Sequence, residues 1–345
     1  MIHAVIPDIV REHVAQAAFQ WSQHRLLSQA VPPDQAALAA LRARLVANLD
    51  GALIADEAAW QIGLAQFADY PEPGELFVAS HLAIASNVQP RIDRVLELAH
   101  QVPAARAGLA GALTWFTPQV SGPVVQQMQL SYSPVIRSVA IDVLAFHRAD
   151  PKDRLPGWLA DPAPVLRASA CRLAAVLQRQ DCAEIVARLA AAPDPEVRFA
   201  AATALAALGH PQAVVALKAE ARQGPHATEA LRLLSQTAPP ADFLQFLRAL
   251  YDQAETRPLA VRGMGMTGDR RRLGWLIGEM AAPATAEAAG ESFLELFPEA
   301  STAEGLFSDD EAVLGPAFAG LTALLPVAER VTAWATQAAA RQHGA

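Results

Sequence analysis

The stretch that decides the fold is "DPEVRFAAATALAALGHPQAVVAL", residues 194–217. Asp194 is suited to cap a helix, because its carboxylate can accept hydrogen bonds from backbone N–H groups that lack partners in the first turn. Pro195 fits that first turn, where its missing N–H costs nothing. Small and apolar residues follow at helical spacing up to Gly209, and a second apolar segment comes after it. The stretch therefore predicts two helices joined by a short turn.

The opening of this stretch recurs three times upstream, always with Pro at the second position and Arg at the fifth. The upstream copies are "VPAARAGLAGALTWF" from Val102, "SPVIRSVAIDVLAFH" from Ser133 and "APVLRASACRLAAVL" from Ala163. A second helical segment follows each copy. Neither helix could bury its apolar face alone, so the period predicts helical hairpins that stack into an all-α solenoid.

The fifth-position arginines keep the period of the repeat, with spacings of 31, 30 and 31 residues. They are Arg106, Arg137, Arg167 and Arg198. We expect them to form a structural ladder between repeats, in which each bonds an acid or a helix-end carbonyl of the adjacent repeat. Possible acidic partners are Asp142, Asp161 and Asp194. The alternative, a row of arginines that binds an anionic ligand, is less favoured because the arginines follow the structural period itself.

The stretch resembles a bacterial HEAT repeat, whose pattern is D-P-x-V-R-x-x-A-x-x-A-L-x-x-L-G followed by a second helix. The matching residues are Asp194, Pro195, Val197, Arg198, Ala201, Ala204, Leu205, Leu208 and Gly209. Neighbouring copies depart from the pattern; Ala163, for example, stands in place of the aspartate. Degenerate copies are expected to continue to about residue 297.

The N-terminal region does not follow the repeat phrase and predicts separate helices. They are "IPDIVREHVAQAAFQWSQHRLL" from Ile6, "PPDQAALAALRARLVANLDG" from Pro32, in which Gly51 is expected to end the helix, and "ADEAAWQIGLAQFAD" from Ala55. With "PGELFVASHLAIAS" from Pro73, this region resembles one family of bacterial HEAT-repeat proteins that are often encoded among type VI secretion genes. The residues that carry the resemblance are Glu12, His13, Ala18, Phe19, Trp21, Leu49, Asp50, Gly51, Leu53, Glu57 and Trp60. The resemblance brings no catalytic residues with it.

These patterns predict three regions. Residues 1–70 form an N-terminal helical cap, residues 71–297 form HEAT-like repeats, and residues 298–345 form an acidic loop and a C-terminal helix. A solenoid needs polar caps that stop end-to-end stacking. We expect the two terminal regions to provide them.

The segment "RGMGMTGD", residues 262–269, contains the spacing G-x-G-x-x-G, which can mark a dinucleotide site when a strand precedes it. Aligned with the decisive stretch, Gly268 falls on Gly209. We therefore predict that Gly268 ends a helix in the left-handed conformation and that Gly263 and Gly265 are positions of close packing. No dinucleotide is expected.

Charge and cysteine usage limit the class of protein. The net charge is −8, from 27 basic and 35 acidic residues, which argues against nucleic acid as a partner. Cys171 and Cys182 lie in different predicted helices and form no C-x-x-C motif, which fits a reducing compartment. The N-terminus lacks an apolar signal core, and no apolar stretch is long enough to span a bilayer. The prediction is a cytoplasmic protein with no membrane insertion.

No catalytic or metal-binding constellation stands out. The sequence has no H-E-x-x-H, G-x-S-x-G or P-loop motif, and its histidines are dispersed. The acids of residues 309–311 lack EF-hand spacing and are expected to lie in a loop that caps the next helix. We predict no metal, no cofactor and no enzymatic activity.

Two segments are candidates for binding a partner, both in second helices, the type expected to line the concave wall. "DRRRLGW" offers Arg270, Arg271 and Trp275, residue types that are enriched at binding hot spots. "VVQQMQL" offers Gln126 and Gln127. The simpler interpretation of the first segment is surface arginines beside a tryptophan that packs between repeats.

The leading hypothesis is a non-enzymatic scaffold or adaptor that binds a protein, and the family resemblance implies a type VI secretion component as that partner. The alternative is a HEAT-like DNA-binding protein or DNA-repair glycosylase, which requires a continuous positive groove that would include Arg188, Arg222 and Arg270. A pigment-attaching HEAT-like lyase is a third reading and requires a deep apolar pocket. The identity of the partner, the oligomeric state, the curvature and the binding face stay open at this level.

Overall fold

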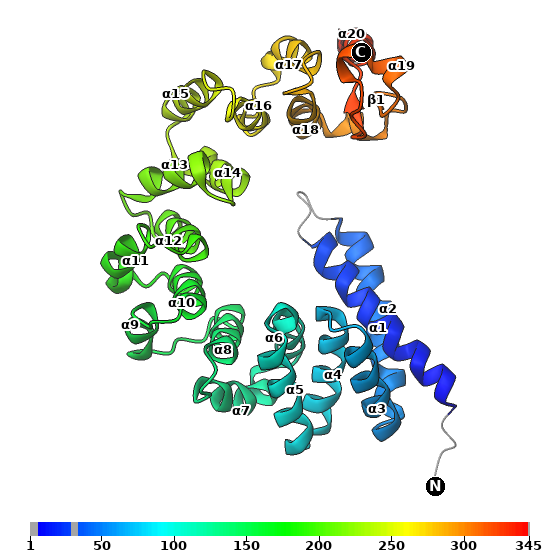
Figure 1. The fold of residues 1–345 in the computed structure, drawn as a ribbon, viewed down its shortest axis with the longest axis vertical. Helices are drawn as coiled ribbons and strands as arrows, with labels where there is room; N and C mark the ends of the chain where they lie inside the picture. The colour runs from blue at the N-terminus through cyan, green and yellow to red at the C-terminus, as the bar shows by residue number, and fades with distance from the viewer. Residues whose placement is uncertain (1–5, 29–33, 344–345) are drawn as a thin grey trace. The chain divides into compact units, whose positions relative to one another are not determined.

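A computed structural model describes residues 6–28 and 34–343 of the chain (Figure 1). The chain folds into two compact units, residues 1–186 and 187–345. The boundary between the units falls inside a helix. The two units are separated by packing, whereas the three regions expected from the sequence are separated by repeat pattern. Pro32 and Pro33, which were expected to precede the second helix, lie outside the described residues.

The first unit consists of helices joined by short turns. In chain order they are α1 (Pro7–Leu27), α2 (Gln35–Ile54), α3 (Glu57–Asp69), α4 (Pro73–Ser86), α5 (Gln89–Gln101), the 3₁₀-helix η1 (Pro103–Ala105), α6 (Arg106–Trp115), α7 (Pro118–Gln129), α8 (Pro134–Phe146), α9 (Arg154–Leu159), α10 (Pro164–Val176), the 3₁₀-helix η2 (Gln180–Cys182) and α11 (Ala183–Leu189), which crosses into the second unit. Helices α4, α6, α8 and α10 pack successively against one another, and α1 packs against α2, α3 and α4.

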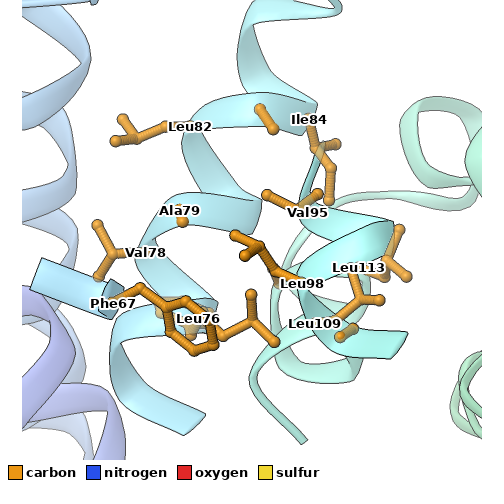
Figure 2. Packing of buried hydrophobic residues seen from close by; sticks show 14 of the residues in the cluster. Phe67, Leu76, Val78, Ala79, Leu82, Ile84, Val95, Leu98, Leu109 and Leu113 are labelled. Carbon is orange, nitrogen blue, oxygen red and sulfur yellow. The ribbon is translucent and has the colours of Figure 1, made fainter. Parts of the chain in front are cut away.

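The core of the first unit lies between successive helices (Figure 2). Phe67 of α3, Leu76 of α4, Leu98 of α5 and Leu109 of α6 are among its buried side chains. Full burial of one such side chain stabilises the fold by about 1.5–3 kcal/mol. Each helix buries apolar side chains against the helix before it and the helix after it. The stack therefore has a continuous apolar interior and not a single central core.

The second unit continues the alternation of first and second helices. Its elements are α12 (Pro195–Ala207), α13 (Ala213–Gln223), α14 (Ala227–Thr237), α15 (Pro240–Tyr251), α16 (Arg257–Gly265), the 3₁₀-helix η3 (Arg270–Arg272), α17 (Leu273–Met280), α18 (Ala286–Leu296) and the 3₁₀-helix η4 (Pro298–Thr302). The fold is the all-α solenoid that the repeat period predicts.

The C-terminal segment contains more structure than the loop expected from its sequence. Strand β1 (Phe307–Ser308) pairs antiparallel with β2 (Leu325–Pro326), and α19 (Glu311–Leu314) and the 3₁₀-helix η5 (Pro316–Phe318) lie between them. Asp310 accepts a hydrogen bond from the backbone N–H of Ala312 at 2.9 Å and so caps α19, as expected. The terminal helix α20 (Ala328–His343) packs against α17 and therefore covers the end of the stack.

The capping residues and prolines predicted from the sequence lie at the N-termini of α8, α10 and α12, with one exception. The Asp194 carboxylate accepts from the N–H of Val197 at 3.0 Å, and the Ser133 hydroxyl accepts from the N–H of Ile136 at 3.4 Å. Ala163 stands at the same position of α10 and offers no cap. Proline follows all three as the first helical residue.

The expectation that Gly51 ends its helix is wrong, because α2 continues to Ile54. Gly51 is instead a close-packing position: a Cβ atom there would lie 2.8 Å from the His13 ring. Packing against α1, and not a turn, accounts for the glycine.

Candidate functional site

A cleft of about 200 Å³ opens between α15, α16 and α17 in the second unit. Its walls are mostly apolar and aromatic, with three charged side chains among them. The lining residues are Leu244, Leu247, Arg248, Tyr251, Asp252, Ala260, Met264, Arg272 and Trp275. The cleft is the candidate site because it combines concave apolar surface with a few polar groups, as ligand sites in proteins do.

Two aromatic rings meet where α15 and α17 approach the cleft. The rings of Tyr251 and Trp275 lie with centroids 5.6 Å apart and planes tilted by 57°. The Tyr251 hydroxyl donates a hydrogen bond to Glu279 of α17 at 2.6 Å. This bond to a carboxylate, with partial burial, raises the pKa of Tyr251. The phenol is therefore a fixed donor that holds the aromatic pair in place.

Arg257 supports the same ring from α16. Its guanidinium lies 5.1 Å from the centroid of the Tyr251 ring, and its Nε donates to the Tyr251 carbonyl at 3.0 Å. The contact with the ring is a cation–π interaction, worth about 0.5–1 kcal/mol at an exposed site. Tyr251 is thus positioned from both neighbouring helices.

The G-x-G-x-x-G segment contributes Met264 to the cleft and has the structure that the alignment predicts. A Cβ at Gly263 would lie 2.5 Å from the Leu247 side chain, and one at Gly265 would lie 2.8 Å from the Ser292 Cα. Gly268 has φ +69°, the left-handed conformation that follows a helix end. Gly263 and Gly265 lie within α16, so the residues that lead into them form a helix and not a strand.

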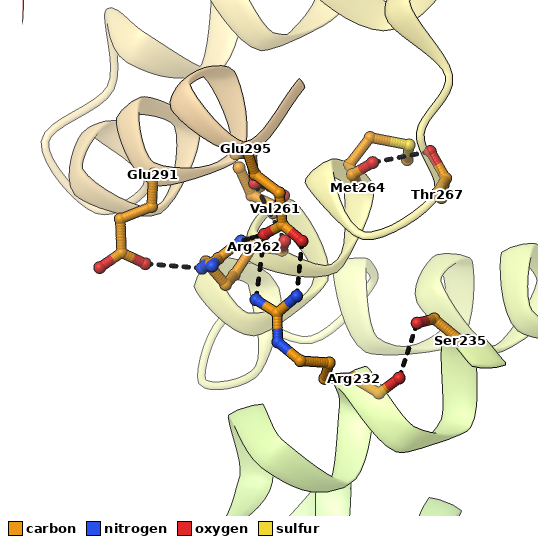
Figure 3. Close-up of polar contacts among 9 residues, drawn as sticks. Arg232, Ser235, Val261, Arg262, Met264, Thr267, Glu291 and Glu295 are labelled. Atoms are coloured by element: carbon orange, nitrogen blue, oxygen red, sulfur yellow. Dashed lines mark hydrogen bonds and ion pairs between the residues drawn. The ribbon is translucent and has the colours of Figure 1, made fainter. Parts of the chain in front are cut away.

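A network of ion pairs fixes α16 from its other side (Figure 3). Glu295 of α18 accepts two hydrogen bonds from Arg232 of α14, at 2.7 and 3.1 Å, and another from Arg262 of α16. Arg262 also pairs with Glu291 at 2.8 Å. Burial alone would raise the pKa of Glu295, but the bonds from the two arginines outweigh it and lower that pKa. The wall that carries Met264 is therefore held by neighbours on both sides.

The cleft carries more positive than negative charge. Arg248 and Arg272 contribute guanidinium groups, and Asp252 contributes a carboxylate. Arg248 is exposed and makes no ion pair with any residue that the structure describes. Arg272 lies 3.4 Å from Asp269, but Asp269 also binds Arg271 at 2.7 Å. Hydrogen bonding from Arg271 is the main cause of a lowered pKa of Asp269.

The structure separates the three candidate residues of the "DRRRLGW" segment. Trp275 is half-buried and lines the cleft. Arg270 turns away from it, with its guanidinium 4.7 Å from the Phe297 ring centroid and near Glu299. Arg271 is exposed and bonds Asp269. Sequence reasoning missed Arg248 and Tyr251, which lie three residues apart on α15 and so share a helix face.

Second helices do not lie on the concave side in this unit. Helices α12, α14, α16 and α18 pack successively against one another, whereas the backbones of α13, α15 and α17 hardly approach one another (Figure 1). In a curved stack the tighter row is the inner one. The expectation that second helices line the concave wall is therefore wrong for residues 187–345, and the cleft opens on the outer row.

The candidate glutamines of the first unit lie on α7. The Gln127 side chain donates to Asp93 at 2.8 Å and accepts from Gln89 at 3.1 Å, so it joins α5 to α7. Gln126 is exposed and lines a separate groove whose wall includes Leu130. The two residues therefore do not share a site.

The fifth-position arginines differ in their partners. Arg137 lies 3.4 Å from Asp161, which precedes the next first helix. Arg167 bonds the carbonyls of Asp161 and Pro162 at 2.8 and 3.0 Å, in the segment that enters its own helix.

The other two members of this series also bond nearby. Arg198 bonds the corresponding carbonyls of Ala192 and Pro193, and also Glu220 at 2.8 Å. Among the described residues, the Arg106 side chain donates to the Pro103 carbonyl at 3.2 Å. A reach into the following repeat is thus seen at Arg137. Arg198 joins α12 to α13 through Glu220, and the bonds of Arg167 and Arg106 are local.

The residues required by the alternative nucleic-acid reading lie on separate outer helices. Arg188 lies on α11, Arg222 on α13 and Arg270 on η3. Arg222 and Arg270 each stack on a phenylalanine ring. Among the described residues, no group of histidine, cysteine and acidic side chains is arranged to hold a metal ion. Within residues 6–28 and 34–343, no helix has the length and apolarity needed to cross a membrane.

Comparison with known proteins identifies the repeat. Residues 151–235 match the family model described as HEAT repeats. The matched residues run from α9 into α14 and include residues 194–217. No curated protein and no solved structure matches the chain. Residues 151–235 therefore contain HEAT repeats, as the sequence predicts.

Proposed function

We propose that this chain is a non-enzymatic HEAT-repeat scaffold or adaptor that binds a protein partner, with the α15–α17 cleft as one contact point. The observation that carries the proposal is the cleft itself, which places Trp275 and Tyr251 beside two arginines on the surface of a repeat array. Tryptophan, tyrosine and arginine are the residue types that dominate binding hot spots. HEAT repeats commonly serve as protein-interaction scaffolds, which fits this use.

The partner that the N-terminal resemblance suggests is a component of a type VI secretion system, bound in the cytoplasm. The proposal is tested by capture from a lysate of the native host, with the full-length chain as bait and the bound proteins identified by mass spectrometry. Recovery of a secretion component by the wild-type chain supports that partner. Repeated absence of any such component under gentle washing contradicts it.

The role of the cleft is tested in the same experiment with Trp275→Ala. Loss of the captured partner supports the cleft as the contact point. Phe146→Ala is the matched control, because Phe146 is an aromatic residue of the first unit that is 65% exposed. If this control loses the partner while Trp275→Ala keeps it, the contact lies on the first unit.

A further inference from the structure

We infer that the α15–α17 cleft takes one apolar side chain from a partner peptide whose neighbouring residues are acidic. The inference rests on the proposed scaffold function and specifies the chemistry of what is bound. The volume of about 200 Å³ sets the size of the anchor. An apolar cavity of about 150 Å³ holds benzene, so this cleft matches a side chain such as leucine or phenylalanine.

The walls are suited to such an anchor. Leu244 and Leu247 of α15, Met264 of α16 and Trp275 of α17 supply apolar surface on three sides. The thioether of methionine adapts to irregular shapes and makes favourable contacts with aromatic rings. Tyr251 is already fixed by Glu279 and Arg257, so little side-chain freedom is lost when an anchor enters.

The charges beside the cleft favour acidic neighbours of the anchor. Arg248 has no ion-pair partner among the described residues, and Arg272 shares Asp269 with Arg271. Arg271 extends the positive surface, with a side chain that is 90% exposed. The opposing carboxylate of the lining is Asp252. A carboxylate near Arg248 would gain a charge-assisted hydrogen bond that the chain itself does not supply.

A peptide fits these observations better than a nucleic acid does. The apolar cleft accepts one side chain, and the arginines beside it are few. A nucleic-acid surface requires a continuous basic track along a phosphate backbone. The arginines of this unit are interrupted by Asp252, Asp269 and Glu279.

The experiment selects ligands without assuming their sequence. A random peptide display library is panned against the full-length chain, and the enriched peptides are synthesised with a fluorescent label. Their dissociation constants are measured by fluorescence polarisation for the wild type, Trp275→Ala, Arg248→Glu and Arg94→Glu. Arg94 is the matched control, because it is an exposed arginine on α5 of the first unit.

The expected peptides carry one large apolar residue flanked by Asp or Glu. Trp275→Ala should weaken their binding at least tenfold, Arg248→Glu about fivefold or more, and Arg94→Glu less than twofold. Raising the salt concentration should weaken binding to the wild type more than binding to Arg248→Glu, because the variant has lost one of the attractive charges. Arg248→Glu should also prefer a peptide in which lysine replaces the acids. Because Arg248 is exposed, that variant remains informative even if Trp275→Ala fails to fold.

Several results would overturn the inference. They are the absence of enriched peptides, enrichment of basic or wholly apolar peptides, and binding that neither cleft variant changes. Binding of a labelled single-stranded oligonucleotide that Arg248→Glu abolishes would also overturn it. The scaffold function fails separately, when no partner is captured from the host lysate. Lysate capture that survives both cleft variants keeps the scaffold and removes only this site.

Discussion

Arg232 and Glu295 lie 63 residues apart in the sequence and are joined by two parallel hydrogen bonds of 2.7 and 3.1 Å. The same carboxylate binds Arg262, so it connects first helices of three successive pairs. Such a bidentate contact is geometrically specific as well as strong. The pair therefore fixes the order and spacing of α14, α16 and α18 beyond what their alanine-rich apolar faces require.

Replacing Glu295 with Gln should lower the free energy of unfolding by about 1–3 kcal/mol, because two half-buried guanidinium groups lose their charged acceptor. Thermal and urea unfolding followed by circular dichroism measure the change. Glu291→Gln is the matched control: Glu291 is 57% exposed, so its loss should cost less than about 1 kcal/mol. Equal effects of the two substitutions would contradict the central place of Glu295.

The same carboxylate gives a pH dependence with a definite sign. The pKa of Glu295 is lowered in the folded chain from an ordinary value of 4.5. Its contribution to stability is therefore complete above about pH 4.5 and is lost as the pH falls through the lowered value. We expect Glu295→Gln and the wild type to converge in stability on acidification. A gap that stays constant from pH 7 to pH 3 would count against the ion pair.

His81 should make the first unit sensitive to mild acid. The residue is 4% exposed and stacks on Phe116 with ring centroids 4.7 Å apart. Burial lowers its pKa from 6.5 to about 4. The stabilisation is present above pH 6.5 and is lost as the pH falls toward 4, by a total of about 3 kcal/mol.

His81→Phe removes this titration and should flatten stability between pH 6.5 and pH 4. The test is the melting temperature across that range. The same substitution at His226, which stacks on Phe199, controls for the replacement of a stacked histidine. If the melting temperature of His81→Phe falls with pH as steeply as that of the wild type, the acid sensitivity belongs to other groups.

Gly265→Ala should destabilise the second unit, because the new Cβ would meet the backbone of α18 at Ser292. The cost of such overpacking is about 1–3 kcal/mol. Gly274→Ala is the opposite case, since no atom lies within 4 Å of a Cβ there and the position is helical. That variant should gain about 0.4–1 kcal/mol. Calorimetry measures the stability of both variants. Opposite effects indicate that close packing, and not backbone flexibility, requires glycine at position 265.

Ala163→Ser should stabilise the chain by supplying the helix cap that α10 lacks. The backbone at Ala163 already has the extended conformation found at Ser133 and Asp194. A gain of about 1 kcal/mol is expected, with a loss of similar size for Asp194→Ala. Chemical denaturation measures both. If Ala163→Ser brings no gain, the cap is not limiting for α10.

The sequence predicted the fold in detail because its signals are local. Pro195 and Asp194 fix where a helix starts, and the backbone at Gly268 needs a left-handed residue, whatever the distant packing. Alignment to the stretch that begins at Asp194 was enough to interpret the glycine-rich segment correctly. The prediction for Gly51 was wrong because a glycine inside a helix and a glycine at its end look alike in a sequence. Only the opposing helix, which carries His13, distinguishes the two.

The cleft was only partly predictable, because it depends on side chains brought together from three helices. Trp275 could be selected by residue type, but Arg248 and Tyr251 belong to a degenerate repeat that carries no distinctive motif. The arginines of the repeat phrase show the same limit. Their spacing is regular, yet Arg137 bonds Asp161 across repeats while Arg167 bonds the carbonyl of the same residue.

The joining of α15 to α17 through side chains has a thermodynamic consequence. An occupant of the cleft would touch both α15 and α17, which the chain itself joins through the Tyr251–Trp275 ring pair and the Tyr251–Glu279 hydrogen bond, so it would add a second, removable link between them. Since a ligand that binds only the folded form adds its binding free energy to local stability, amide hydrogens of both helices should exchange more slowly when the cleft is filled. Hydrogen exchange would then report occupancy, even for a ligand that moves no backbone atom.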